Sequence, residues 1–193
     1  MKKLLITGFE PFGGETINPS WEAVSLLPDT IGEYTLTKFR IPVVFDKAAK
    51  IIQDEAEKLS PDAILCIGQA GGRAAITPEL VGINLRHAPI PDNEGNQPQD
   101  TPILVGGENA LFATIPVRNI ATAIHMAGIP SQVSYSAGAY VCNDVLYTLL
   151  HRFQGSKTRV GFIHIPFCAN QNKTPSMSLD DIVKGLTIAI ENL

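Results

Sequence analysis

A cysteine stands directly after a bend of small residues in the stretch SYSAGAYVCND, residues 134–144. The small residues predict a sharp turn at Gly138 and Ala139, and the apolar period that follows predicts a helix beginning near Tyr140. Cys142 would then lie in the first helical turn, where unpaired N–H groups and the helix dipole favour a thiolate. Such a thiolate could attack a carbonyl, with backbone N–H groups of the turn holding the oxyanion. The alternative is a buried cysteine that only packs, which is the commoner fate of free thiols.

A nucleophilic cysteine needs a base, and His164 is the histidine best placed to be one. It ends the strand-like run RVGFIHI, which Pro166 terminates. Ligands of open α/β sheets bind beyond the carboxyl ends of strands, and the run QVSYSA before Cys142 also predicts a strand. If those two strands are neighbours, the sulfur and the imidazole come within hydrogen-bond reach. A core histidine bonded to the backbone is the alternative.

A third group would have to orient the imidazole, and Glu79 in AITPELVGINL is the candidate. If this segment is a strand, Glu79 shares a face with apolar neighbours, where a carboxylate needs a partner such as an imidazolium. If Thr77 instead caps a helix with Pro78 at its first position, Glu79 only complements the helix dipole. The residues alone leave both interpretations open.

Two glycine-rich loops, GFEPFGG (8–14) and GQAGGR (68–73), follow strand-like runs. Neither matches an established phosphate-binding pattern, so the phosphate signal is weak. Phe9 and Phe12 in the first loop have no packing period. They suit a flat apolar ligand, or they fold back as a lid on the core.

Short β-branched runs alternate with segments of helical period, which is typical of βαβ units around a largely parallel sheet. We therefore expect one α/β domain over residues 1–193. From His87 to Asn109 the composition turns polar and rich in Pro and Gly, which predicts a long functional loop. The expected strands are 4–7, 34–42, 62–68, 132–137 and 159–165, with 76–85 extended in one interpretation, and the expected helices are 18–27, 46–59, 116–128, 141–153 and 178–190.

Charge and cysteine content narrow the class of partner. The net charge is −4 without a cluster of Lys or Arg, which argues against nucleic acid and anionic membranes as partners. The apolar stretch that follows the first two lysines is too short for a secretory or membrane-spanning segment, so we expect a cytoplasmic protein. Three cysteines at unpatterned spacing indicate neither a disulfide framework nor a metal site.

Long, ordered motifs run nearly from end to end of the chain: TGFEPFGG, NPSWEA, CIGQAGGR, ITPE, INL, IPDNEGNQP, SYSAGAYVCN, GFIHIPF and TPSMSLD. Together they resemble the pyroglutamyl peptidase I (pyrrolidone carboxyl peptidase) family of cysteine peptidases. The resemblance implies an α/β/α sandwich around a twisted, mostly parallel mixed sheet, and a triad that falls on Cys142, His164 and Glu79. It also implies cleavage of N-terminal pyroglutamate from peptides, no cofactor, and a cytoplasmic homotetramer.

The resemblance also assigns substrate-binding positions. Phe9 and Phe12 would flank the lactam ring, Gln69 and the neighbourhood of Val141 would help to bind it, and Asp92 falls on a further family motif.

Two positions depart from the family pattern. Pro89 stands where many relatives have Arg, and Arg86 is the cation that could take its place. Cys168 lies four residues beyond His164 and is expected to be a bystander near the site. The rival functions are a nucleoside phosphorylase-like transferase and a non-catalytic α/β protein that binds phosphate or a nucleotide.

Overall fold

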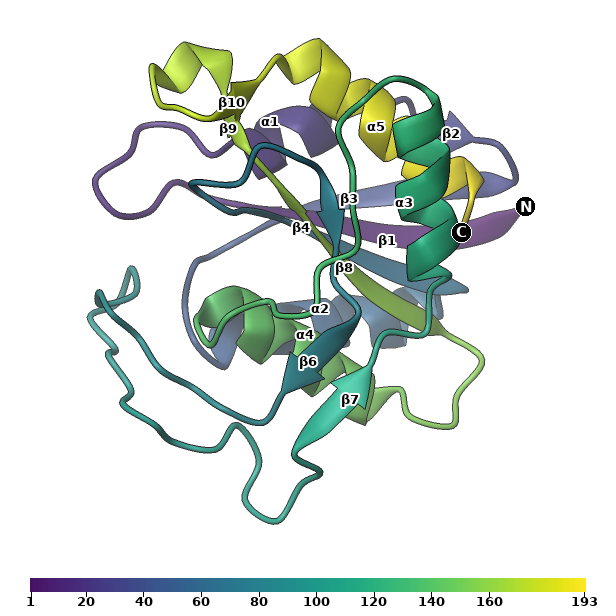
Figure 1. The fold of residues 1–193 in the computed structure, drawn as a ribbon. Helices are drawn as coiled ribbons and strands as arrows, with labels where there is room; N and C mark the ends of the chain where they lie inside the picture. The colour runs from purple at the N-terminus through teal and green to yellow at the C-terminus, as the bar shows by residue number, and fades with distance from the viewer.

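The computed structural model describes residues 1–193, which alternate strands and helices around one central sheet (Figure 1). The helices are α1 (Pro19–Leu26), α2 (Lys47–Leu59), α3 (Val117–Met126), α4 (Val141–Arg152) and α5 (Leu179–Glu191). The strands are β1 (Lys2–Phe9), β2 (Thr30–Ile31), β3 (Tyr34–Ile41), β4 (Ala63–Gln69), β5 (Thr77–Pro78), β6 (Val81–Ile83), β7 (Ala110–Phe112), β8 (Arg159–Ile165), β9 (Phe167–Cys168) and β10 (Ser176–Met177).

The central sheet has six strands in the order β2-β3-β1-β4-β8-β5. Strands β3, β1, β4 and β8 run parallel, and the short edge strands β2 and β5 are antiparallel to their neighbours. Because parallel strands end at the same edge, the loops after β1, β4 and β8 meet there. The predicted mostly parallel, mixed sheet is confirmed.

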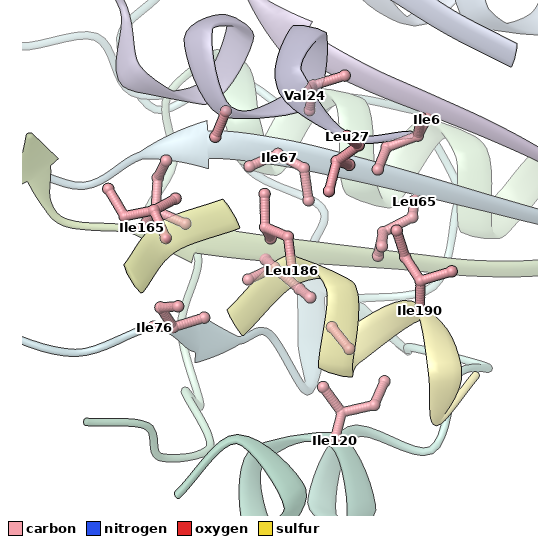
Figure 2. Packing of buried hydrophobic residues seen from close by; sticks show 14 of the residues in the cluster. Ile6, Val24, Leu27, Leu65, Ile67, Ile76, Ile120, Ile165, Leu186 and Ile190 are labelled. Carbon is pink, nitrogen blue, oxygen red and sulfur yellow. The ribbon is translucent and has the colours of Figure 1, made fainter. Parts of the chain in front are cut away.

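Helices cover both faces of this sheet, so the predicted α/β/α sandwich is also confirmed (Figure 1). One apolar cluster joins the sheet to α1, α3 and α5, and Figure 2 shows Leu186 and Ile190 of α5 meeting side chains of α1 and β4 there. A second cluster joins the opposite face to α2 and α4. Successive buried side chains of β1 and β4 point alternately into the first and the second cluster, as expected for a sheet covered on both sides. None of the helices is both long and apolar enough to cross a bilayer.

The connection from β1 to α1 is fixed at both of its ends. The side chain of Asn18 caps α1 by accepting from the Ser20 backbone at 3.1 Å, and Ser20 Oγ accepts from Phe9 N at 2.9 Å. Gly8 allows this close approach, since a Cβ there would lie 2.6 Å from the Trp21 backbone. The loop that carries the first aromatic motif therefore leaves from a rigid base.

The predicted strand at 132–137 is wrong. This serine-containing segment is mostly exposed or half-buried, and it joins the sheet edge only through isolated bridges of Ser131 to Ile76 and of Ser134 to Glu79. Such a segment lacks the continuous apolar face that a buried strand requires. As a result β5 separates this segment from β8, and Cys142 and His164 do not follow neighbouring strands.

The predicted long loop is present, because no helix or strand lies between β6 and β7. Its tip reaches back to the loop after β1, where Asn93 Nδ2 donates to the carbonyl of Pro11 at 2.9 Å. Both loops lie at the carboxyl edge of the sheet (Figure 1).

Candidate active site

Cys142 is the second residue of α4, as the sequence predicts. Gly138, at a positive φ of 78°, makes the bend before the helix, and Tyr140 is the extended residue that precedes its first turn. The first N–H groups of α4 have no carbonyl partner within the helix and point toward the start of the helix, beside the sulfur. These groups are the candidates to hold an oxyanion.

The sulfur lies over the end of β4. A Cβ added to Gly68 would meet Cys142 Sγ at 3.0 Å and the ring of Phe162 at 2.8 Å, so only glycine leaves this space free. Gly68 is paired with His164 in the register of β4 and β8. The parallel pairing therefore brings the nucleophile candidate and the base candidate to the same edge of the sheet.

His164 and Glu79 form a buried hydrogen bond. His164 Nδ1 lies 2.7 Å from Glu79 Oε1, and their exposed fractions are 3% and 0%. Glu79 follows β5, which pairs with β8, and its own N–H donates to the carbonyl of Phe162 at 2.9 Å. The strand interpretation of this segment is therefore right, and the helix interpretation is wrong. With Nδ1 engaged by the carboxylate, Nε2 is the ring nitrogen left to exchange a proton with a substrate or a nucleophile.

Arg73 is the fourth group in this cluster. Its Nη1 donates to Glu79 Oε1 and to Thr77 Oγ1, each at 2.6 Å, and its Nη2 donates to the carbonyl of Ser136 at 2.9 Å. One guanidinium thus ties the carboxylate to the bend that precedes Cys142. In the sequence this arginine is only the end of a glycine-rich loop, because nothing local identifies partners that are distant in the chain.

The ionisation of the cluster follows from burial and from these contacts. Burial alone would raise the pKa of Glu79, but the bond to His164 and the contacts with Ser134 and Arg73 outweigh it, so the pKa lies below 4.5. Burial lowers the pKa of His164 below 6.5, although the bond to Glu79 opposes this. Burial raises the pKa of the Cys142 thiol, and the charge of Glu79 adds to the effect. Burial and the charge of Glu79 therefore oppose the thiolate that the start of α4 favours, and the thiolate stays a prediction.

Cys142 and His164 line one pocket of about 280 Å³. No hydrogen bond joins their side chains in this structure, and catalytic hydrogen bonds commonly tighten only when substrate binds. The lining is mostly apolar, and its polar side-chain atoms belong to Gln69, Arg73, Tyr140, Cys142 and His164. The lining residues are Phe9, Phe12, Val43, Gln69, Ala70, Gly71, Arg73, Ala137, Gly138, Tyr140, Cys142 and His164.

Aromatic rings form one wall of the pocket. The ring centroid of Tyr140 lies 6.3 Å from that of Phe12 and 5.4 Å from that of Phe45, edge to face with the latter. Its hydroxyl donates to the carbonyl of Pro91 at 3.1 Å, which fixes the ring against the long loop. Tyr140 was missed as a site residue, although an aromatic two positions before the nucleophile candidate is a signal that could have indicated it.

Two predicted substrate-binding residues do not line the pocket. Val141 is fully buried in the cluster beneath α4. Asp92 accepts hydrogen bonds from the backbone N–H groups of Phe45 (3.0 Å), Glu94 (2.9 Å) and Asn96 (2.8 Å). Asp92 therefore anchors the long loop to the segment before α2.

The two departures from the family pattern also lie outside the pocket. Arg86 donates from Nε to Asp144 Oδ1 at 2.7 Å and pairs with Asp46, so it does not take the place of an arginine at position 89 in the pocket. Cys168 is 1% exposed and contacts Gln171 instead of the pocket.

A larger groove of about 880 Å³ opens beside α2. Its lining includes Lys47, Arg86 and Glu94 but none of the three triad candidates. The smaller pocket is therefore the candidate active site. No cluster of three or more His, Cys, Asp or Glu side chains is arranged to bind a metal ion.

Comparison with known proteins gives one answer. The pyroglutamyl peptidase family model matches residues 2–193. A pyrrolidone-carboxylate peptidase of Streptococcus pyogenes serotype M3 (strain SSI-1) is 49% identical over 194 residues, which cover 97% of this chain and 90% of the relative. The crystal structure of pyroglutamyl peptidase I from Bacillus amyloliquefaciens matches with a TM-score of 0.96 at 46% identity, covering 100% of this chain and 96% of that one. The pyrrolidone carboxyl peptidase from Thermococcus litoralis gives a TM-score of 0.94 at 36% identity, covering 99% and 92%. The chain therefore belongs to the pyroglutamyl peptidase family.

Proposed function

We propose that this chain hydrolyses the bond after an N-terminal pyroglutamyl residue, with Cys142 as nucleophile, His164 as general base and acid, and Glu79 as the group that orients the imidazole. The observation that carries the proposal is the 2.7 Å bond from His164 Nδ1 to Glu79 Oε1 beside a pocket that Cys142 also lines. Family membership makes the chain a hydrolase, and neither rival function is favoured.

The reaction proceeds through an acyl-enzyme. His164 Nε2 takes the proton from Cys142 Sγ, and the sulfur attacks the pyroglutamyl carbonyl carbon. The oxyanion is held by N–H groups at the start of α4. The tetrahedral intermediate collapses to a thioester, and the leaving amine takes the proton from His164. Water, deprotonated by the same imidazole, then attacks the thioester, and collapse releases pyroglutamate and returns the proton to the sulfur.

Specificity follows from the charge of the ligand. A pyroglutamyl lactam has neither a free amino group nor a carboxylate, so an aromatic pocket accepts it without burying any charged group. An N-terminal glutamyl residue would bring an ammonium and a carboxylate into the same space. The lining holds no carboxylate to pair with the ammonium, and its one guanidinium, that of Arg73, already pairs with Glu79, which supports a narrow preference for the lactam.

The proposal is tested with three fluorogenic amides that differ only in the acyl group: pyroglutamyl, prolyl and glutamyl. We expect release of the fluorophore from the pyroglutamyl amide, with kcat/KM at least about 100-fold above the other two. Equal rates on all three would contradict the assigned specificity. No hydrolysis of any of them, together with thermal stabilisation by phosphate or a nucleoside, would support the rival functions.

The charge of Arg73 is expected to influence how kcat/KM depends on pH. The acid limb of kcat/KM reports protonation of the base, and the lowered pKa of His164 places this limb below 6.5. Because the positive charge of Arg73 also lowers the pKa of His164, Arg73→Met is expected to raise that pKa and move the acid limb to higher pH. Because Arg73→Met also unties Glu79 from the bend before Cys142, we expect kcat/KM at neutral pH to fall roughly 10-fold, equivalent to about 1.4 kcal/mol.

The matched control is Lys184→Met, which removes an exposed cation on α5. Its pH profile should coincide with that of the unmodified chain. An acid limb that stays in place in Arg73→Met would show that this guanidinium does not act on the imidazole.

The homotetramer and the cytoplasmic location that the resemblance implies stay predictions. Large apolar side chains on the surface, including those of Val105 (87% exposed) and Phe112 (68% exposed), are candidates for contacts between subunits.

A further inference from the structure

A hydrogen-bonded relay reaches the pocket from a segment that the reaction does not use. Gln69 is the last residue of β4, and its side chain lines the pocket. Its Oε1 accepts from Nε2 of Gln171 at 2.9 Å, across 102 positions of sequence. Gln171 ends the single 3₁₀ turn (Ala169–Gln171) that follows β9.

The orientation of the Gln171 amide is set by the backbone. Its Oε1 accepts from the N–H of Cys168 at 3.0 Å. A reversed amide would bring two donors face to face at this position, so Oε1 has to lie toward Cys168 and Nε2 toward Gln69. The same rule then applies one step further along the relay. Since Gln69 Oε1 receives Nε2 of Gln171, the Nε2 end of Gln69 is left as a donor at the pocket.

The segment that carries Gln171 is itself held in place. Phe167 and Cys168 of β9 pair with β10, and Cys168 is buried. The ring of Phe167 packs on the loop after β4 so closely that a Cβ on Gly71 would meet it at 2.4 Å. The relay therefore joins two segments that strand pairing and close packing hold in place.

We propose that Gln171 is a positioning residue that turns the Gln69 amide so that Nε2 donates to the lactam carbonyl. This inference rests on the proposed function. A lactam carries a carbonyl acceptor next to an N–H donor, so an amide free to rotate could serve either group. An amide held by Gln171 selects the carbonyl. A prolyl ring has the same size but no carbonyl at this position, and it would leave the Gln69 donor without a partner.

The relay also explains what the segment around Cys168 contributes. Its backbone N–H, and not its thiol, takes part in the relay. The thiol is buried against Asn170 and Gln171. Cys168 thus supports the hydrogen bond between Gln171 and Gln69 through its backbone, and its thiol has no part in the reaction.

The test is Gln171→Glu, which keeps nearly the same shape and still accepts from the Cys168 N–H. The second oxygen of the new carboxylate faces Gln69, so the Gln69 amide is expected to reverse, donate to that oxygen and present its own oxygen to the pocket. We expect kcat/KM for a pyroglutamyl amide to fall roughly 10- to 100-fold, mainly through KM. Gln171→Ala removes the constraint without reversing it and should lose less.

A role through Gln69 is separated from a structural role by a double-mutant cycle. In a Gln69→Ala background, Gln171→Glu is expected to change kcat/KM by less than about 2-fold, because the amide that it acts on is gone. Asn170→Ala is the matched control, since Asn170 contacts the Cys168 thiol but not Gln69. Losses that multiply in the double variant, or an unchanged KM in Gln171→Glu, would overturn the proposal.

A binding experiment keeps this inference separate from the proposed function. Binding of 2-pyrrolidone, a bare lactam, and of cyclopentanone, which has the carbonyl without the N–H, is followed by ligand-observed NMR. Both are expected to bind the unmodified chain and to weaken roughly 10-fold in Gln171→Glu. If the chain hydrolyses no pyroglutamyl amide but shows this pattern, the proposed function fails and the relay stands. Equal binding to both proteins overturns the relay, whether or not the amide is cleaved.

Discussion

Cys142→Ser is expected to lower kcat for a pyroglutamyl amide by roughly 10⁴-fold or more, while the thermal unfolding temperature stays close to that of the unmodified chain. An alcohol is a much weaker acid than a thiol, and burial already lowers the pKa of His164, so the imidazole is a poor base for a hydroxyl. The smaller oxygen fits the space over Gly68 without strain, because the sulfur is the larger atom. Single-turnover kinetics and a thermal melt measure the two effects.

Cys66→Ala is the matched control for this prediction. Cys66 lies in the same apolar cluster but does not line the pocket, so its removal should leave most of the turnover. Alkylation offers a second measurement: Cys66 and Cys168 are 0% and 1% exposed, and Cys142 should be the thiol that iodoacetamide modifies. Because its pKa is raised, the rate of alkylation should still climb with pH above neutrality. If Cys142→Ser kept its turnover, Cys142 would not be the nucleophile.

Local signals in the sequence were sufficient for the features that short segments determine. The small-residue bend predicts the start of α4 within one residue, and Pro166 predicts the end of β8. Both positions are decided by backbone conformations that only certain residues adopt, and Gly138 indeed has a positive φ. The layers follow from hydrophobic period in the same way for α2, α3 and α5, each of which has one buried side, whereas α4 is buried over most of its length.

Features that depend on packing between distant segments could not be predicted in this way. The segment 132–137 has the period of a strand, yet β5 occupies the place beside β8 and leaves that segment at the edge. The sequence did not decide whether the segment around Glu79 is a strand or a helix, because β5 is only two residues long. The pairing of β5 with β8 decides for the strand. The carboxylate of Asp92 could contact a ligand, but in the folded chain it accepts hydrogen bonds from three backbone N–H groups instead.

The balance of charges was the least predictable part of the site. The position of Cys142 at a helix start favours a thiolate, but burial raises the pKa of the thiol. The burial of one side chain depends on the whole fold and cannot be predicted from a short motif. Arg73 and Gln171 act through partners that only the folded chain brings near. Neither could be assigned a role from its neighbours in sequence.

Glu79→Gln is expected to lower kcat by roughly 10²- to 10⁴-fold with a smaller change in KM. The carboxylate accepts from His164 Nδ1, and its charge stabilises the imidazolium that forms when Cys142 attacks. A glutamine keeps the shape but removes the charge, and its amide can turn a donor toward Nδ1, which would place the ring proton on the wrong nitrogen. Arg73 would also lose the charge that faces it, so we expect the free energy of unfolding to fall by about 1–3 kcal/mol at neutral pH.

The pH dependence of stability separates this charge effect from a simple loss of packing. Because the folded pKa of Glu79 is depressed, its contribution is complete above its unfolded pKa, near 4.5, and is lost as the pH falls through the folded value. The difference in unfolding free energy between the unmodified chain and Glu79→Gln should therefore be constant near neutrality and shrink in acid. Glu191→Gln, at an exposed acid on α5, serves as the control with no such trend. If Glu79→Gln kept both its turnover and its acid limb, the imidazole would hold its tautomer unaided, and this carboxylate would serve only as the partner of Arg73.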